Sequence, residues 1–428
     1  MARQLKDSGF SWIGKIPVDW DVQKVKNAFY RSKEEAHIED PVVLSLARSG
    51  VKIRDISTNE GQLAESYYNY NPVIPGDLLL NPMDLYSGAN CSVSNVEGVI
   101  SPAYINLRTR GNYSPTYYDY YFKTQYWAMS FFAHGKGVSF DNRWTLSPND
   151  LFNYAIPVPS FNEQECIAEF LDRKCAEIDS VIEKTKQSIE EYRKIRLSVI
   201  TTCVTKGLRG TRPMKVSGIK WVKEIPAEWE NRKMLSILSM RVIDGPHESP
   251  ELFDDGVPYV SANAIENGRI NFDKKRGFIS KEYCDQCDKR YRPQRNDILV
   301  IKLGATTGQV AIVDTDERFN IWVPLAAVRC NHLALPKFVY YAMQSDYYIR
   351  QMEMSWTYGT QQTLGVKTIE RLRIIIPNLD EQKEIADYLE KKCAEIDTLI
   401  AKKTALLEEM ESYKKSVIYE YVTGKKEV

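Results

Sequence analysis

The sequence lacks several features that would assign it quickly to a class of protein. No apolar run approaches the roughly 20 residues of a membrane-spanning helix, and residues 1–10 lack the apolar core of a secretion signal. Eight cysteines scattered over 428 residues are too sparse for a disulfide scaffold. We therefore expect a cytoplasmic protein with reduced thiols.

An excess of charge of one sign is also missing. Lys and Arg together number 57, as do Asp and Glu, so the formal net charge is zero. Any binding of DNA must therefore depend on local basic patches. With 43% hydrophobic and 27% charged residues, the composition is that of a globular protein, and the length predicts roughly two to four domains.

Groups suited to catalysis or metal binding are few. The four histidines form no His-x-x-x-His pair, and Cys284 and Cys287 supply only half of a zinc site. The Gly-Lys-Gly segment at 135–137 and the glycines at 304 and 308 are too incomplete for a phosphate-binding loop. We expect a chain with no catalytic residues and no bound metal.

What the sequence does contain is an internal repeat. Six of thirteen residues are identical between 8–20 and 217–229, including two tryptophans in each copy. Twelve of twenty are identical between 163–182 and 381–400, including a Lys-Cys-Ala-Glu-Ile-Asp block. The chain is therefore predicted to consist of two halves in tandem.

Between these boxes the order of predicted elements survives, although identity is largely lost. Each half has an apolar strand, a tyrosine-rich helical stretch and a final strand beside a proline: 77–80, 116–132 and 155–157, then 297–300, 336–352 and 374–377. We expect the tyrosines to fill the core of each domain, with stacking on bases as the alternative. The halves should share a fold while displaying different residues.

The segment that closes each half is predicted to be a long helix of about 40 residues, or about 60 Å. Its apolar residues advance by alternating steps of four and three, which is the heptad spacing of a coiled coil. The seam consists of Leu171, Cys175, Ile178, Ile182 and Ile189 in the first helix and Leu389, Cys393, Ile396, Ile400 and Leu407 in the second. Two matched seams favour pairing with each other, and two separate surface helices are the alternative.

A basic cluster lies in the second half. Residues 269–295 contain nine basic and four acidic side chains, with aromatic residues between them, and Lys274, Lys275 and Arg276 are consecutive. Such clusters can neutralise DNA phosphates. A solvated charged face is the equally weighted alternative.

The motifs, in their order, resemble the DNA-specificity subunit of type I restriction-modification systems over nearly the whole chain. The resemblance rests on the Gly-x-x-Trp…Ile-Pro-x-x-Trp box that opens each half, on Asp-Gly-Pro-His at 244–247, on Gly-Thr-Gln-Gln at 359–362 and on Val-Thr-Gly-Lys at 422–425. The first half differs, because it has no Asp-Gly-x-His motif and has Gly-Lys-Gly-Val at 135–138 in place of the Gly-x-Gln motif.

The resemblance implies an α+β (mixed α/β) fold with two target-recognition domains and an antiparallel coiled coil. We expect the first recognition domain at 1–160, the first spacer helix at 161–208, the second domain at 209–377 and the second helix at 378–428. Each domain would read one half of an asymmetric, bipartite site on double-stranded DNA, and the helices would set the spacer. The half-sites would lie about one helical turn, ~34 Å, apart.

The resemblance also implies a non-catalytic chain that works with partner subunits. Two methyltransferase subunits would methylate adenine with S-adenosylmethionine, and translocase-nuclease subunits would restrict DNA. S-adenosylmethionine, ATP and magnesium would be bound by those partners, and this chain would bind no cofactor.

Base contacts are expected from polar side chains on loops, since Arg or Lys pairs with guanine and Asn or Gln with adenine. The candidates are Arg48, Lys52, Tyr86, Ser87, Lys136 and Arg143 in the first half and His247, Lys274, Lys275, Arg276, Lys302, Thr306, Thr307, Gln361 and Gln362 in the second. The alternatives are a coiled-coil scaffold holding two protein-binding domains without DNA readout, and an enzyme that acts alone.

Overall fold

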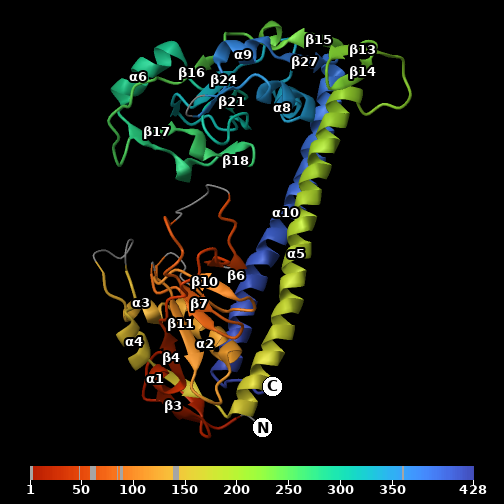
Figure 1. Cartoon of the computed structure of the whole chain (residues 1–428). Coiled ribbons are helices and arrows are strands. Elements are labelled where there is room, and N and C mark those ends of the chain that lie inside the picture. The colour runs from red at the N-terminus through yellow and green to blue at the C-terminus, as the bar shows by residue number, and fades with distance from the viewer. Residues whose placement is uncertain are drawn as a thin grey trace. The chain divides into compact units, whose positions relative to one another are not determined.

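The chain divides into two structural units, each built from one half of the repeat together with parts of both long helices. Unit 1 comprises Met1–Lys186 and Ala405–Val428, and unit 2 comprises Gln187–Thr404. The structure is a computed structural model that describes residues 3–47, 49–57, 64–83, 85–86, 90–137, 144–358 and 361–428 (Figure 1). Across these residues, no helix combines the length and apolar character needed to cross a membrane.

Unit 1 is organised around an antiparallel four-stranded sheet in the order β4-β11-β8-β9, on which helix α2 packs. These elements are β4 (Phe29–Ser32), β11 (Ile105–Thr109), β8 (Leu78–Leu80), β9 (Cys91–Val93) and α2 (Pro115–Trp127). Strand pairs surround the sheet: β1 (Leu5–Asp7) with β2 (Lys15–Pro17), β3 (Asp21–Lys24) with β12 (Ala155–Val158), β5 (Leu44–Ala47) with β6 (Gly50–Ile53), and β7 (Asn71–Val73) with β10 (Gly98–Ile100). The short helices are α1 (Val25–Ala28), α3 (Ser130–Ala133) and α4 (Pro148–Asn153).

Unit 2 repeats this arrangement with a four-stranded sheet in the order β16-β24-β21-β22. These strands are β16 (Ile243–Asp244), β24 (Leu325–Val328), β21 (Ile298–Ile301) and β22 (Val310–Ile312). The pairs β13 (Met214–Ile219) with β14 (Val222–Pro226) and β15 (Glu230–Lys233) with β27 (Arg373–Ile376) match β1 with β2 and β3 with β12. The repeat read from the sequence is therefore a repeat of topology.

Unit 2 also has further strands and helices around this sheet. They are a three-stranded sheet of β20 (Gly277–Ile279), β17 (Val257–Val260) and β23 (Asn320–Ile321), the hairpins β18 (Ile265–Glu266) with β19 (Arg269–Ile270) and β25 (Thr357–Tyr358) with β26 (Gln362–Thr363), and helices α6 (Lys281–Arg290), α7 (Pro336–Met343), α8 (Asp346–Glu353) and α9 (Val366–Arg371). Single 3-10 turns occur at η1 (Met234–Ile237), η2 (Ala262–Ala264) and η3 (Phe272–Lys274).

The tyrosine-rich stretches are helical and buried, which confirms that they belong to the cores. Tyr117, Tyr118 and Tyr121 on α2 are fully buried, as is Tyr348 on α8. Each stretch is two helices, not one: the first is interrupted at Met129, whose φ of 59° is left-handed, and the second at Ser345, the extended residue before α8. Rings that fill the core are not available to stack on bases.

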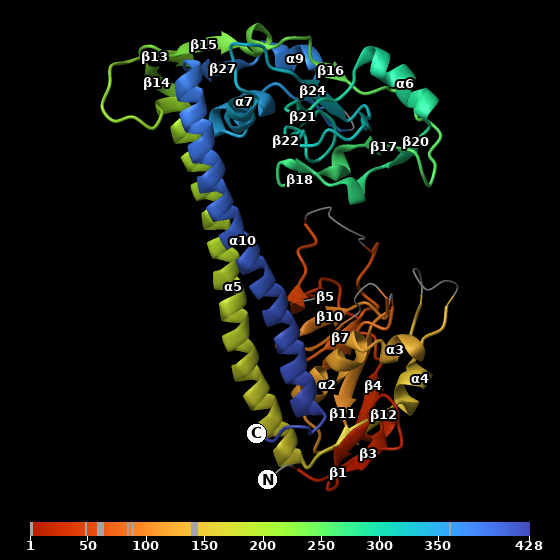
Figure 2. The same ribbon diagram turned by 180° about the vertical axis from the view of Figure 1, so that it is seen from behind.

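Helices α5 (Phe161–Lys206) and α10 (Leu379–Val422) lie side by side and antiparallel within each unit (Figures 1 and 2). In unit 1, Lys414 Nζ lies 2.7 Å from the carboxylate of Asp179. In unit 2, Arg196 Nε lies 2.9 Å from Oδ1 of Asp397. Residues later in α5 therefore pair with residues earlier in α10, as antiparallel helices require.

The predicted seam forms the contact between these helices. Leu171, Cys175, Ile178, Ile182, Ile189, Leu389, Cys393 and Ile396 are buried, and Ile400 and Leu407 are half-buried. The coiled-coil prediction is confirmed, and the alternative of two separate surface helices is excluded.

Candidate nucleic-acid interface

A buried carboxylate organises the polar side chains at the end of β16. Asp244 Oδ2 lies 3.0 Å from Lys302 Nζ and 3.0 Å from His247 Nε2, and Oδ1 accepts a hydrogen bond of 2.7 Å from Arg290. We call these four residues the Asp244 cluster. Burial alone would raise the pKa of Asp244, but the hydrogen bonds from Lys302 and His247 and the positive charges of Lys302 and Arg290 lower it overall. One carboxylate thus faces two cations and an imidazole, which leaves positive charge in excess.

The position of Asp244 depends on the glycine that follows it. The Gly245 amide donates to the Leu325 carbonyl at 3.2 Å, and a Cβ on Gly245 would overlap the Ile321 carbonyl oxygen and the backbone of Trp322. Only glycine allows this close approach of two chain segments. The Asp-Gly-Pro-His motif therefore packs directly on the turn between β23 and β24.

A second group of candidates converges on Lys302 from the other side. The loop at 303–308 meets the β25–β26 hairpin: the Thr307 hydroxyl donates to the Gly304 carbonyl at 2.7 Å, and the Gly304 amide donates to the Gln362 carbonyl at 3.1 Å. The Leu364 amide donates to the Lys302 carbonyl at 2.8 Å. Six sequence-predicted residues are thus joined in one region: His247, Lys302, Thr306, Thr307, Gln361 and Gln362.

These six residues differ in how they can act. The side chains of His247, Thr306 and Gln361 are exposed and Gln362 is half-buried, so they can reach a ligand. Lys302 and Thr307 are buried, at 8% and 7% exposure, and make the internal contacts given above. In this structure these two side chains hold the loops in place. Their residue types alone do not show whether they contact a ligand or support a loop.

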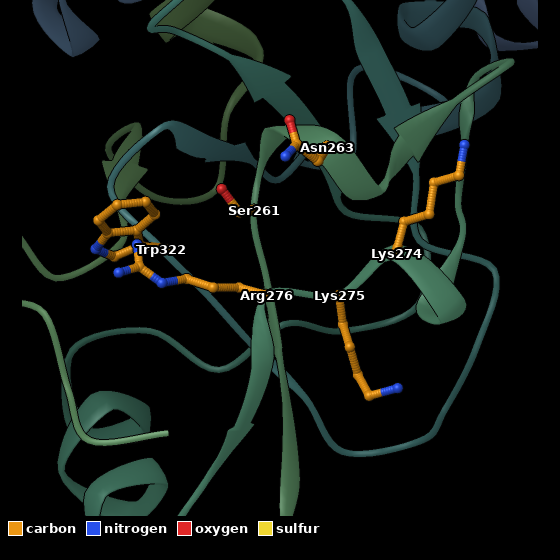
Figure 3. A pocket seen from close by; sticks show the side chains of 6 residues that line it. All are labelled: Ser261, Asn263, Lys274, Lys275, Arg276 and Trp322. Carbon is orange, nitrogen blue, oxygen red and sulfur yellow. The ribbon is translucent and has the colours of Figure 1, made fainter. Parts of the chain in front are cut away.

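The basic segment at 274–276 lines a pocket of about 330 Å³ beside the same turn (Figure 3). Its other lining residues are Ser261, Asn263 and Trp322. The guanidinium carbon of Arg276 lies 3.3 Å from the centroid of the Trp322 ring. No local pattern in the sequence marks Trp322 as a site residue, because its partner, Arg276, is 46 positions away.

The candidates of the first half lie on separate segments of unit 1. Lys52 is exposed on β6, and Tyr86 is 61% exposed, with its ring 6.2 Å from that of Phe132. Lys136 is exposed, with its amino group 3.7 Å from Asp150. The predicted residues Arg48, Ser87 and Arg143 lie outside the described part of the chain.

Six of the eight cysteines are buried as packing residues, whereas Cys166 is exposed and Cys330 is half-buried. Burial raises the pKa of Cys284 to about 11, so its thiol stays protonated near neutral pH. Within the residues that the structure places, no three His, Cys, Asp or Glu side chains come together as a metal site.

Comparison with known proteins identifies relatives of the whole chain. Residues 226–409 match the family described as the type I restriction modification DNA specificity domain. The specificity subunit of the type I restriction enzyme EcoBI from Escherichia coli is 25% identical over 405 residues, covering 91% of this chain and 81% of the relative. The MjaVIII specificity subunit from Methanocaldococcus jannaschii is 21% identical, covering 96% and 94% of the two chains.

A solved structure agrees with the architecture. A chain from a study of complex assembly and conformational transition of the type I R-M system matches with a TM-score of 0.70 over 96% of this chain and 99% of the other. Their identity is 14%, so this likeness concerns the fold alone. Over nearly its whole length, this chain is therefore similar to the DNA-specificity subunits of type I restriction-modification systems.

Proposed function

We propose that this chain is the sequence-specific DNA-binding subunit of a type I restriction-modification enzyme and that each unit reads one half of an asymmetric, bipartite site. The observation that carries the proposal is the convergence of the Asp244 cluster with the 303–308 loop and the β25–β26 hairpin. Exposed amide, hydroxyl and imidazole groups gather there around excess positive charge, which suits contact with base edges and phosphates.

The repeat supports reading of two different half-sites. Both units have a central four-stranded sheet of the same order, so both can present loops in the same way. The loops differ: Asp-Gly-Pro-His has no counterpart in the first half. The paired helices α5 and α10 are the device that would set the spacer between the half-sites.

The chain acts with partners in this proposal and has no catalytic role of its own. Two methyltransferase subunits dock on it and methylate adenine with S-adenosylmethionine, and translocase-nuclease subunits that use ATP and magnesium join for restriction. All of these work in the cytoplasm. Because the net charge is zero, the isolated chain should bind DNA weakly and gain much of its phosphate affinity from the partners.

The test is long-read methylation sequencing of cells that express this chain with a cognate methyltransferase subunit. Cells that express the methyltransferase subunit alone are the control. Methylated adenine in one split motif, present only with this chain, is the expected result and gives both half-sites and the spacer. A soluble complex that methylates no motif would overturn the proposal in favour of a coiled-coil scaffold.

A further inference from the structure

Arg276 and Trp322 form a preorganised pair in unit 2. Arg276 follows η3, and its amide donates a hydrogen bond of 2.9 Å to the Tyr259 carbonyl on β17, which fixes its backbone to the sheet. Its guanidinium carbon lies 3.3 Å from the centroid of Trp322 (Figure 3). The indole is fixed in turn, because its nitrogen donates to the Glu248 carbonyl at 3.2 Å.

The other two cations of the pocket are engaged elsewhere. Lys274 forms an ion pair with Glu266, and the Lys275 amino group donates to the Phe272 carbonyl at 3.2 Å. Figure 3 shows both amino groups pointing away from the stacked pair. Among the residues that the structure describes, no carboxylate pairs with Arg276, whose only assigned side-chain contact is the indole face.

This arrangement favours recognition of the flat edge of a base over a purely ionic contact with a phosphate. A guanidinium whose central carbon lies 3.3 Å over the centre of an aromatic ring is held against that ring face, and its planar fork presents N–H donors along its edge. Two such donors match the O6 and N7 acceptors of guanine, and each bidentate contact of this kind strongly favours guanine over other bases. A contact made only to a phosphate would need the charge but not the fixed plane.

We propose that Arg276, positioned by Trp322, reads a guanine in the half-site of unit 2, with Ser261 and Asn263 lining the pocket where the edge of that base pair enters. Arg276 is the specificity-determining residue, and Trp322 is a positioning residue. The inference rests on the proposed function, because it names one base that unit 2 recognises.

The experiment compares the methylated motif of the wild type with those of Arg276→Lys and Trp322→Leu, each co-expressed with the methyltransferase subunit. Arg276→Lys keeps the charge, but a flexible ammonium neither stacks on the indole nor presents two donors in a fixed plane, so the preorganised pairing with guanine is lost. The expected result is that one G·C position in one half-site becomes degenerate, with at least a tenfold loss of preference for guanine, in both variants. Arg350→Lys is the matched control, because its guanidinium pairs with Asp346 within α8 at 2.7 Å, and it should leave the motif unchanged.

Binding of the purified complex to DNA carrying the wild-type motif separates base reading from phosphate contact. Arg276→Lys should leave the salt dependence of binding unchanged and remove the preference for guanine at the affected position. If Arg276→Lys still directs methylation to the wild-type motif with its guanine unchanged, the inference is overturned and the proposed function stands. A wild-type complex that methylates no motif would overturn both, and a loss of every position in the half-site would show that Arg276 supports the fold instead.

Discussion

The indole nitrogen of Trp20 donates a hydrogen bond of 2.9 Å to Oε2 of Glu163 in the first turn of α5. In unit 2, Trp229 donates the equivalent bond, 2.8 Å long, to Oε2 of Glu381 in the first turn of α10. Both tryptophans are completely buried. The repeated box therefore ties each unit to the beginning of a long helix, which explains why box and helix are the two segments whose sequence is repeated.

Removing Glu381 should destabilise the protein more than removing Glu163. Each glutamate also pairs with an arginine at 2.6 Å, Glu381 with Arg212 and Glu163 with Arg3, but the Glu381 side chain is 2% exposed and the Glu163 side chain 23% exposed. Glu381→Ala leaves the buried Trp229 indole nitrogen without its acceptor and removes one of the two carboxylates that pair with Arg212, whose ion pair with Glu228 at 3.1 Å remains. We therefore expect a loss of about 3 kcal/mol in the free energy of unfolding. Glu163→Ala should cost about 1–3 kcal/mol. Urea denaturation followed by tryptophan fluorescence measures both.

The matched control for these variants is Glu390→Ala. Glu390 pairs with Lys337 at 2.8 Å on the surface, with both side chains more than 40% exposed. Surface ion pairs contribute little, so a change below about 1 kcal/mol is expected. Equal losses in Glu163→Ala and Glu381→Ala would contradict the role given to burial.

The Asp244 cluster should make stability depend on pH at the acid end. Because the pKa of Asp244 is lowered from its ordinary value of 3.8, its carboxylate stabilises the fold fully above pH 3.8 and progressively less as the pH falls through the folded-state pKa. Asp244→Asn leaves the buried Lys302 without a counter-charge and should cost about 3–5 kcal/mol at pH 7. Denaturation of wild type and variant at pH 7 and near pH 3 measures the difference, which should shrink at the lower pH. A difference that is the same at both values would contradict this account.

Adding a side chain at Gly245 should weaken DNA binding without unfolding the protein. In Gly245→Ala the Cβ overlaps the backbone of Trp322 and must push the motif away from the turn. Both the Asp244 cluster and the indole under Arg276 would shift, so we expect DNA affinity of the assembled complex to fall about tenfold, or about 1.4 kcal/mol. Binding of a labelled duplex at fixed salt measures the change. Gly210→Ala is the control, because its Cβ would meet no atom within 4 Å, and an equal fall there would refute the argument.

Lengthening one paired helix should change the spacer but not the half-sites. Inserting about four residues into α5 adds about 6 Å of helix. The methylated motif of this variant should keep both half-sites and show a different number of bases between them, as methylation sequencing reports. Val181→Ala, at a 45% exposed position on the same helix, should leave the motif as in the wild type. An unchanged spacer in the insertion variant would count against the helices as its determinant.

The sequence by itself determined the features that repeat or have a period. The boxes at 8–20 and 217–229 show the two halves by identity, and the heptad steps from Leu171 to Ile189 show which helix face is buried. Such signals are local, because helix geometry alone places every third or fourth residue on one face. The tandem repeat and the pairing of the two helices follow from them, whereas the antiparallel orientation and the mixed fold were implied by the family resemblance.

Only the tertiary structure decided which distant residues meet. Asp77 pairs with Arg108 at 2.8 Å in unit 1, and Asp297 pairs with Arg329 at 2.7 Å in unit 2. Each aspartate directly precedes a central strand, and each arginine lies near the end of the neighbouring strand or just after it. In the same way, strand order brings Lys302 to Asp244, and the turn after β23 brings Trp322 under Arg276. No period along the chain encodes these contacts, since they depend on sheet order and on the conformation of the connecting loops.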